Sequence, residues 1–284
     1  MVSQVIVEHP IDDYLRLDRV PYTWCPGCGI GTALQHILRA IKELVEEGKL
    51  DRKKILFVTG IGCTGRAAGL VRLDSAHVVH GRPIPFAIGA KLANPEINPI
   101  VFSGDGDIAG IGGNHLLHAA RKNMDILVIM INNLTYALTG GQLAPTTPFG
   151  VYSTTTPYGN PETPIDAARM LMSMGVNYVA RWSITHLTKI KDSVKYALQK
   201  RGFRFIEILS TCPEIFGRHI KIGDPVALYR KLQKIARIKS KPSFEDIKYD
   251  WESEITCGVF LDDDKPGFFD NFIRSIEVVK GGRD

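Results

Sequence analysis

The chain has 284 residues, of which 44% are hydrophobic and 23% charged, the ordinary composition of a globular protein. Its net charge of +5 is mild, and no groove-reading motif accompanies the basic residues, which argues against nucleic-acid binding. The longest apolar run, 126–131, is far shorter than the roughly 18 residues of a membrane helix, and the first residues lack the apolar region of a signal peptide. We therefore expect a cytoplasmic protein that does not engage a membrane.

Short apolar runs alternate with helical patterns along the chain. The expected strands are 54–60, 98–104, 125–131 and 203–209, and the expected helices are 30–47, 111–122, 164–174 and 186–200. Runs that are apolar throughout are typical of strands covered on both faces. The pattern predicts an α/β fold, a mostly parallel sheet with helices on both faces. We expect a main domain over 1–210 and a small helical C-terminal extension over 211–284.

Two segments fall outside this alternation. Residues 138–163 form a long stretch rich in Gly, Pro and Thr, and a loop of this length is usually functional or disordered. Basic residues recur over 230–241, interleaved with Leu and Ile. That stretch is either a solvated helix face or a docking patch for an acidic carrier protein.

A glycine-rich motif follows the strand expected at 98–104. Its sequence, SGDGD, places Gly104 and Gly106 where the backbone can approach a phosphate, beside the start of a helix. Asp105 in this motif and Asn133 at the next strand end offer a carboxylate and an amide oxygen, which are ligands for Mg²⁺. Asp107 is expected either to cap the helix or to contact a diphosphate. The alternative is that these residues have only a structural role, as a tight turn with an Asn cap.

The five cysteines do not have the pattern of a disulfide framework. Cys25 and Cys28 form a C-x-x-C pair, whereas Cys63 and Cys212 stand alone at the ends of two expected strands. Four thiolates suit either an iron–sulfur cluster or a structural zinc ion. The two solitary positions favour the cluster, and Cys257 has no evident partner.

Together these motifs resemble the β subunits of 2-oxoacid:ferredoxin oxidoreductases. The matching stretches occur in the expected order between residues 24 and 218; they are WCPGCGIG, GIGCTGRAAG, HVVHGRPIP, GDGDIAGIGGNHLLHAARKN, INNLTYALTGGQLAPTTP and TCPEIFGR. The resemblance implies a thiamine diphosphate-binding fold. It also implies one [4Fe–4S] cluster on Cys25, Cys28, Cys63 and Cys212, and Mg²⁺ on Asp105, Asn133 and Thr135, the last through its backbone carbonyl.

The resemblance further implies a set of residues around the cofactor. They are Ile61, Gly62, Cys63, His80, Gly81, Gly104, Asp105, Gly106, Asp107, Asn133, Thr135, Leu138, Thr139 and Gly140. His80 is also a candidate catalytic residue, and for it we keep the alternative that its ring is hydrogen-bonded within the fold.

The implied reaction is oxidative decarboxylation of a 2-oxoacid, with coenzyme A taking the acyl group and ferredoxin the electrons. The glutamate that activates thiamine belongs to an α subunit in this family, so we expect this chain to be inactive alone. Arg66 could pair with the distal carboxylate of 2-oxoglutarate, although it could instead hold a phosphate or a carboxylate of the partner subunit. This favours a 2-oxoglutarate enzyme. The alternatives are pyruvate or branched 2-oxoacids, an electron-transfer subunit without thiamine chemistry, and a zinc-stabilised binding module.

Overall fold

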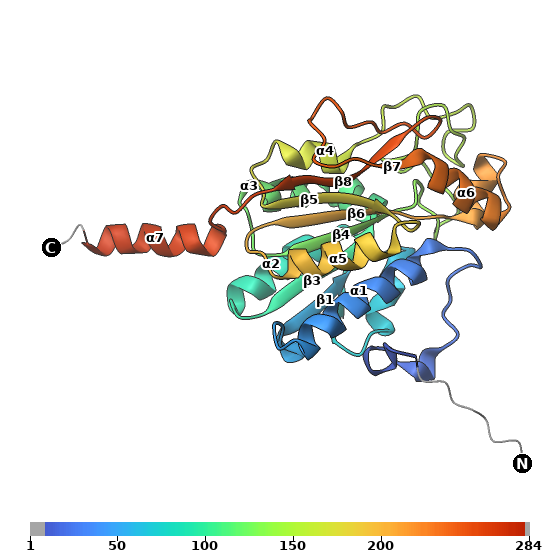
Figure 1. Cartoon of the computed structure of the whole chain (residues 1–284). Helices are drawn as coiled ribbons and strands as arrows, with labels where there is room; N and C mark the ends of the chain where they lie inside the picture. The colour runs from blue at the N-terminus through green and yellow to red at the C-terminus, as the bar shows by residue number, and fades with distance from the viewer. Residues whose placement is uncertain (1–8, 282–284) are drawn as a thin grey trace, which may run out of the picture.

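Within residues 9–281, which the computed structural model describes, eight strands form one sheet (Figure 1). The first eight residues, on which the absence of a signal peptide partly rested, and residues 282–284 lie outside that description. The strands are β1 (Ile55–Thr59), β2 (Asp74–His77), β3 (Asn98–Gly104), β4 (Leu127–Asn132), β5 (Tyr178–Ser183), β6 (Arg204–Leu209), β7 (Ala236–Ile238) and β8 (Ile255–Asp262). Their order is β2-β1-β3-β4-β6-β5-β8-β7, and every neighbouring pair is parallel except β5 with β8.

Helices cover both faces of this sheet. They are α1 (Gly29–Glu46), α2 (Pro83–Ala93), α3 (Gly113–Arg121), α4 (Ala167–Met172), α5 (Leu187–Leu198), α6 (Pro225–Ile235) and α7 (Phe268–Gly281). Short 3₁₀ or π turns add η1 (Asp12–Tyr14), η2 (Leu17–Arg19), η3 (Arg52–Lys54), η4 (Cys63–Gly69), η5 (Gly106–Ile111) and η6 (Pro213–Gly217). Helices α1 and α5 lie in front of the sheet in Figure 1, and their buried residues belong to one hydrophobic core. Buried residues of α2, α3 and α4 belong to a second hydrophobic core. The expected fold class is confirmed.

The sequence of β4 shows why both faces must be covered. Leu127, Ile129 and Ile131 pack into the core that contains α1 and α5, whereas Val128 and Met130 pack into the core that contains α2, α3 and α4. Successive side chains of a strand point to opposite faces, so a strand that is apolar throughout needs a helix layer on each side. All five side chains are buried. Burying each one stabilises the fold by about 1.5–3 kcal/mol.

The segment after residue 210 differs from the helical extension that we expected. It contains α6 and α7, but it also adds β7 and β8 to the sheet, and β8 pairs antiparallel with β5. Its ITCGVFLD sequence is rich in β-branched and apolar residues, and it covers an edge of β5 that would otherwise be open. Cys257 is buried in this strand. The domain boundary at residue 210 stays a prediction.

Two further expectations concern the surface. Within residues 9–281, no helix combines the length and apolar character needed to cross a bilayer. In the basic stretch 230–241, Lys231 lies 3.0 Å from a carboxylate oxygen of Glu252, and Lys239 lies 3.0 Å from one of Glu254. These ion pairs neutralise part of the stretch, which favours the solvated face over the docking patch.

Candidate functional site

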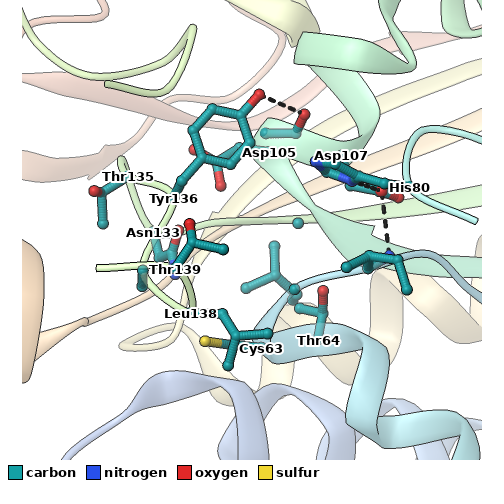
Figure 2. A pocket seen from close by; sticks show the side chains of 16 residues that line it. Cys63, Thr64, His80, Asp105, Asp107, Asn133, Thr135, Tyr136, Leu138 and Thr139 are labelled. Atoms are coloured by element: carbon teal, nitrogen blue, oxygen red, sulfur yellow. Dashed lines mark hydrogen bonds and ion pairs between the residues drawn. The ribbon is translucent and has the colours of Figure 1, made fainter. Parts of the chain in front are cut away.

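The loops that follow β1, β3 and β4 enclose a cavity of about 120 Å³ at the carboxyl end of the sheet (Figure 2). Parallel sheets bind ligands at this end. Twelve of the cofactor residues named from the sequence line it: Ile61, Gly62, Cys63, His80, Gly104, Asp105, Gly106, Asp107, Asn133, Thr135, Leu138 and Thr139. Four further lining residues were not predicted from the sequence: Thr64, Ile131, Tyr136 and Ala137. Gly81 and Gly140 are not among the lining residues.

Asp105, Asn133 and Thr135 bring three polar atoms together on one side of this cavity. The atom of the Asn133 amide that faces the other two lies 3.0 Å from Oδ1 of Asp105 and 2.8 Å from the carbonyl oxygen of Thr135. If this atom is nitrogen, it donates a hydrogen bond to both oxygens. If it is oxygen, three oxygen atoms meet, and when Asp105 is ionised no proton lies between them, which favours a cation at this point.

The spacing of these atoms matches a magnesium site. Ligands held at the usual distance from an octahedral Mg²⁺ lie about 2.9 Å from one another. A carboxylate, an amide oxygen and a backbone carbonyl are also the hard oxygen ligands that Mg²⁺ prefers. Within the described residues, no group of three or more His, Cys, Asp or Glu side chains is arranged to hold a metal ion. The group formed by Asp105, Asn133 and Thr135 is of a different kind, because only one of its three polar atoms belongs to such a side chain.

Asp105 is buried, and its environment controls its charge. Its Oδ2 atom accepts a hydrogen bond from the hydroxyl of Thr146, which belongs to the long loop 138–163. Burial raises the pKa of Asp105 to about 7, although the hydrogen bonds from Thr146 and from backbone groups act in the opposite direction. A cation beside Oδ1 would favour the charged carboxylate and lower this pKa.

The side chain of Asp107 forms hydrogen bonds with the loops around the cavity. Its Oδ1 atom accepts hydrogen bonds from the backbone N–H of Gly81 (2.6 Å) and of Ile61 (3.3 Å), and it also contacts Nδ1 of His80. Its Oδ2 atom accepts a bond of 2.8 Å from the hydroxyl of Ser103. The carboxylate is therefore engaged within the fold and does not cap the following helix. It also lines the cavity, and its contact with a diphosphate stays a prediction. His80 is held within the fold, as in the alternative kept above.

Close packing around Tyr136 and Asp107 explains two of the glycines. A Cβ atom on Gly106 would lie 2.2 Å from the Tyr136 ring, and a Cβ atom on Gly60 would lie 1.9 Å from the Asp107 carboxylate. No side chain is tolerated at such distances. Tyr136 also donates a 3.0 Å hydrogen bond from its hydroxyl to the carbonyl of Gly106, and its ring meets His80 edge-on. This tyrosine therefore forms a wall of the cavity (Figure 2).

Thr64 places an unpaired hydroxyl at the cavity. Its side chain is only 3% exposed, and Oγ1 has no hydrogen-bond partner among the described residues. A Cβ atom on Gly104 would lie 3.5 Å from this oxygen, so the hydroxyl sits over the glycine-rich strand end. A buried hydroxyl without a partner costs about 1–3 kcal/mol. A bound ligand with an acceptor atom would remove that cost.

The three segments that carry Cys25, Cys28, Cys63 and Cys212 are held against one another. Gly29 donates from its backbone N–H to the carbonyl of Thr211 (3.2 Å), and the Thr211 hydroxyl donates to the carbonyl of Gly27 (2.7 Å). Trp24 donates from its indole N–H to the carbonyl of Cys63 (2.8 Å). The C-x-x-C loop therefore bridges the two strand ends that carry the solitary cysteines.

Burial raises the pKa of the Cys28 thiol to about 12 and that of the Cys63 thiol to about 11, and the neighbouring cysteines add to both shifts. Cys25 is exposed, whereas Cys212 is buried. The four thiols do not form a site for a single metal ion. A cubane cluster needs a wider arrangement, because each thiolate binds a different iron atom. The donor set and the converging loops fit such a cluster.

Arg66 lies on the exposed side of η4, outside the cavity lining. Its guanidinium donates a 2.9 Å hydrogen bond to the hydroxyl of Thr23, next to the C-x-x-C loop. Cys257 lies in β8, apart from the other cysteines, and burial raises the pKa of its thiol to about 12.

Comparison with known proteins assigns the family. Residues 60–208 match the family model for the C-terminal TPP-binding domain of thiamine pyrophosphate enzymes. The chain is 43% identical over 279 residues to the 2-oxoglutarate synthase subunit KorB of Methanothermobacter marburgensis, covering 98% of this chain and 96% of that protein. It is 42% identical over 274 residues to the KorB subunit of Methanocaldococcus jannaschii, with 96% and 99% covered. The chain belongs to the β subunits of the 2-oxoacid:ferredoxin oxidoreductases.

A solved structure shows the same architecture. The 2-oxoglutarate:ferredoxin oxidoreductase of Magnetococcus marinus, determined with 2-oxoglutarate, coenzyme A and succinyl-CoA bound, superimposes with a TM-score of 0.83 at 30% identity. The match covers 98% of this chain and 93% of that one. The resemblance noted from the sequence motifs is thus confirmed, as is membership of an oxidoreductase family.

The thiamine-binding match accounts for the cavity but not for all of the cysteines. Every residue that lines the cavity lies within residues 60–208, the part of the chain that matches the thiamine pyrophosphate-binding domain. Cys25, Cys28 and Cys212 fall outside those residues. Thiamine binding therefore does not account for these three cysteines, whose loops are joined to one another and to Cys63 by hydrogen bonds.

Proposed function

We propose that this chain is the thiamine-binding subunit of an enzyme that converts 2-oxoglutarate and coenzyme A to succinyl-CoA and CO₂ and reduces ferredoxin. The observation that carries the proposal is the meeting of Asp105, Asn133 and Thr135, whose Asn133 amide atom lies 3.0 Å and 2.8 Å from the other two oxygens, inside a domain of the thiamine-binding family. The similarity to KorB subunits and to the structure with 2-oxoglutarate bound supports the choice of substrate.

In this proposal the chain's own residues bind and orient the cofactors. Asp105, Asn133 and the Thr135 carbonyl hold Mg²⁺, and Gly104 and Gly106 keep the strand end open to a diphosphate. Asp107 fixes the loops after β1 and β2 around the cavity. Thiamine diphosphate supplies an electron sink for the loss of CO₂ from a 2-oxoacid.

We further propose that Cys25, Cys28, Cys63 and Cys212 bind one [4Fe–4S] cluster. The hydrogen bonds that join their loops support this, and so does Cys63, which belongs to both the cysteine set and the cavity lining. Ferredoxin accepts one electron at a time, and a cluster beside the thiamine site could divide the two electrons of the oxidation. The ferredoxin partner is part of the proposal.

The cavity is incomplete in this chain. Its lining contains no glutamate among the described residues, although thiamine activation requires one in this family. Ile61 and Leu138, which line the cavity, are 40% and 46% exposed. We propose that an α subunit covers these side chains and supplies the glutamate, so that the isolated chain is inactive.

Arg66 is our candidate for the distal carboxylate of 2-oxoglutarate. Its side chain is exposed, and leaving Thr23 would break one hydrogen bond of about 1 kcal/mol. A bidentate pair with a carboxylate is stronger than that bond. The side chain can therefore turn toward a substrate at small cost.

The test is an anaerobic assay of the complex purified through this chain. Coenzyme A-dependent reduction of ferredoxin or of a viologen is followed with 2-oxoglutarate, pyruvate and 2-oxoisovalerate in parallel. We expect a preference for 2-oxoglutarate that Arg66→Ala abolishes and Arg66→Lys partly restores. A preference for pyruvate or a branched acid would keep the reaction and overturn the role of Arg66. No reduction with any of the three acids, from a complex that contains the α subunit, thiamine and iron, would overturn the proposed function.

A further inference from the structure

A polar network whose central side chains are buried lies behind the loop that carries two of the proposed Mg²⁺ ligands. Asn132, the last residue of β4, donates from Nδ2 to Oε1 of Glu207 and to the hydroxyl oxygen of Tyr249, both at 2.7 Å. The other carboxylate oxygen of Glu207 accepts from Nε of Arg181 at 2.7 Å. Arg181 also pairs with Asp166. The side chains of Asn132, Glu207 and Arg181 are 0% exposed.

Burying such a network in a core has a large desolvation cost. Removing two charges from water costs several kcal/mol per ion, and well-packed apolar residues often stabilise a fold equally well or better. Most other side chains of β5 and β6 are apolar and buried, as Val179 and Ile206 are. A contribution to stability alone therefore does not explain why Arg181 and Glu207 lie there.

The network reaches the metal loop through a single hydrogen bond. Oδ1 of Asn132 accepts from the backbone N–H of Leu134 at 3.1 Å. Leu134 has a φ of 65°, the left-handed region, which costs a residue with a Cβ atom about 1–2 kcal/mol. Thr147 holds the same residue from the other side, because its hydroxyl donates to the Leu134 carbonyl at 2.8 Å.

The strained residue separates the two ligands. Leu134 lies between Asn133, which offers its side chain, and Thr135, which offers its carbonyl oxygen. The chain bends at Leu134, and both groups reach the same point beside Asp105. Backbone strain of this kind persists where the surrounding structure enforces it, and it concentrates at functional sites.

We propose that Asn132 is a positioning residue for the magnesium site, and that Glu207 and Tyr249 fix the orientation of its amide. The backbone N–H of Leu134 can only donate a hydrogen bond, so the amide oxygen must face Leu134 and the amide nitrogen must face Glu207. Arg181 holds Glu207 in place. This inference rests on the proposed Mg²⁺ and thiamine diphosphate site, and it extends that site to residues that touch neither ligand.

Tyr249 connects this site to the C-terminal segment. It lies in the chain that leads into β8, and the Arg181 guanidinium sits 4.7 Å from the centre of its ring. The segment after residue 210 thus contributes a buried hydroxyl behind the metal loop, besides adding strands to the sheet.

The test compares the Mg²⁺ requirement for thiamine diphosphate binding among variants of the purified complex. Cofactor binding is measured by calorimetry over a range of Mg²⁺ concentrations, and thermal stability is measured in parallel. The test variants are Asn132→Ala and Tyr249→Phe. The matched controls are Asn177→Ala and Tyr178→Phe, which remove buried hydrogen bonds near the opposite end of β5.

We expect Asn132→Ala to raise the half-saturating Mg²⁺ concentration about 10- to 100-fold, the usual effect of losing the support of a metal ligand. Tyr249→Phe should raise it less, because Glu207 still accepts from the amide. Both controls should lower the melting temperature and leave the Mg²⁺ requirement unchanged. In Mn²⁺-loaded protein, the electron paramagnetic resonance spectrum should change for the test variants and not for the controls.

Equal Mg²⁺ requirements in test and control variants would overturn the positioning role, provided that the wild-type complex binds thiamine diphosphate in an Mg²⁺-dependent manner. Absence of such binding in the wild type would overturn the proposed site itself, and this inference with it. If Asn132→Ala does not fold, Tyr249→Phe decides the question, since it removes one oxygen atom from the network.

Discussion

The hydroxyl of Thr146 donates a hydrogen bond to Oδ2 of Asp105, and this leaves Oδ1 of the carboxylate facing Asn133. Thr146 belongs to the long loop 138–163, whose length had suggested a functional role. Asn160 stabilises this loop, because its amide donates to the Thr147 carbonyl at 2.8 Å. The loop therefore orients the proposed metal ligand that directly follows β3.

Replacing Thr146 with valine should weaken Mg²⁺-dependent binding of thiamine diphosphate about tenfold or more. A hydrogen bond to a charged group contributes about 1.5–3 kcal/mol, and valine has the shape of threonine without the hydroxyl. Calorimetric titration of the metal-free complex measures the effect. Thr146→Ser keeps the donor and serves as the control. Equal affinity of the Thr146→Val and wild-type proteins would show that the hydroxyl does not orient Asp105.

The sequence predicted the features that follow from local pattern. The strands β1, β3, β4 and β6 were found because each is a continuous apolar run, and the motif residues were found because they end such runs. β5 was missed because Arg181 interrupts its apolar sequence. This buried arginine is paired with Glu207 and Asp166, which lie 26 and 15 residues away in the chain. The engagement of Asp107 could not be foreseen either, since three of its partners come from the loops after β1 and β2.

The unpaired hydroxyl of Thr64 leads to a second prediction. We expect it to donate to an acceptor on the bound cofactor or substrate, so Thr64→Val should weaken binding of one of them about 5- to 20-fold. Titrations with thiamine diphosphate and initial rates with 2-oxoglutarate would distinguish the two ligands.

Thr64→Ser retains the hydroxyl and should behave as the wild type. In the absence of ligand, Thr64→Val should be as stable as the wild type or more so, because it removes a buried polar group that has no partner. A loss of stability in Thr64→Val, together with unchanged binding, would contradict a role in ligand contact.

The raised pKa of Asp105 predicts how the metal-free protein responds to pH. Its pKa is raised from 3.8 to about 7 in the folded state, so between these values the folded state holds a proton that the unfolded state has released. The free energy of unfolding should therefore be highest at the acidic end of this window, decrease as the pH rises, and level off above about pH 7. The contribution is at most about 4 kcal/mol.

Urea unfolding of metal-free wild-type protein and of Asp105→Asn, at several pH values, isolates this contribution. The variant cannot titrate at this position, so the difference in unfolding free energy between the two proteins should follow the ionisation of Asp105. Added Mg²⁺ should reduce the loss in the wild type, because the cation compensates the buried charge. A difference that does not change with pH would mean that Asp105 titrates near its ordinary value.

The cysteines give the last prediction. Replacing Cys25, Cys28, Cys63 or Cys212 singly with serine should remove most of the iron and the broad visible absorbance from anaerobically purified protein, since a [4Fe–4S] cluster binds four thiolates. Iron, zinc and acid-labile sulfide are measured per chain. Cys257→Ala is the matched control, because Cys257 is buried in β8 and should not affect any of the three quantities.

The outcome of that comparison also separates the two metal centres. Cys63 lines the thiamine cavity, whereas Cys25 and Cys212 do not, so loss of the cluster through Cys25→Ser should leave thiamine diphosphate binding intact. Cys63→Ser alone is expected to change both iron content and cofactor affinity, because it alters a side chain at the cavity wall. Zinc in place of iron in the wild type would contradict the cluster, and it would leave the enzyme without a route for single electrons to ferredoxin.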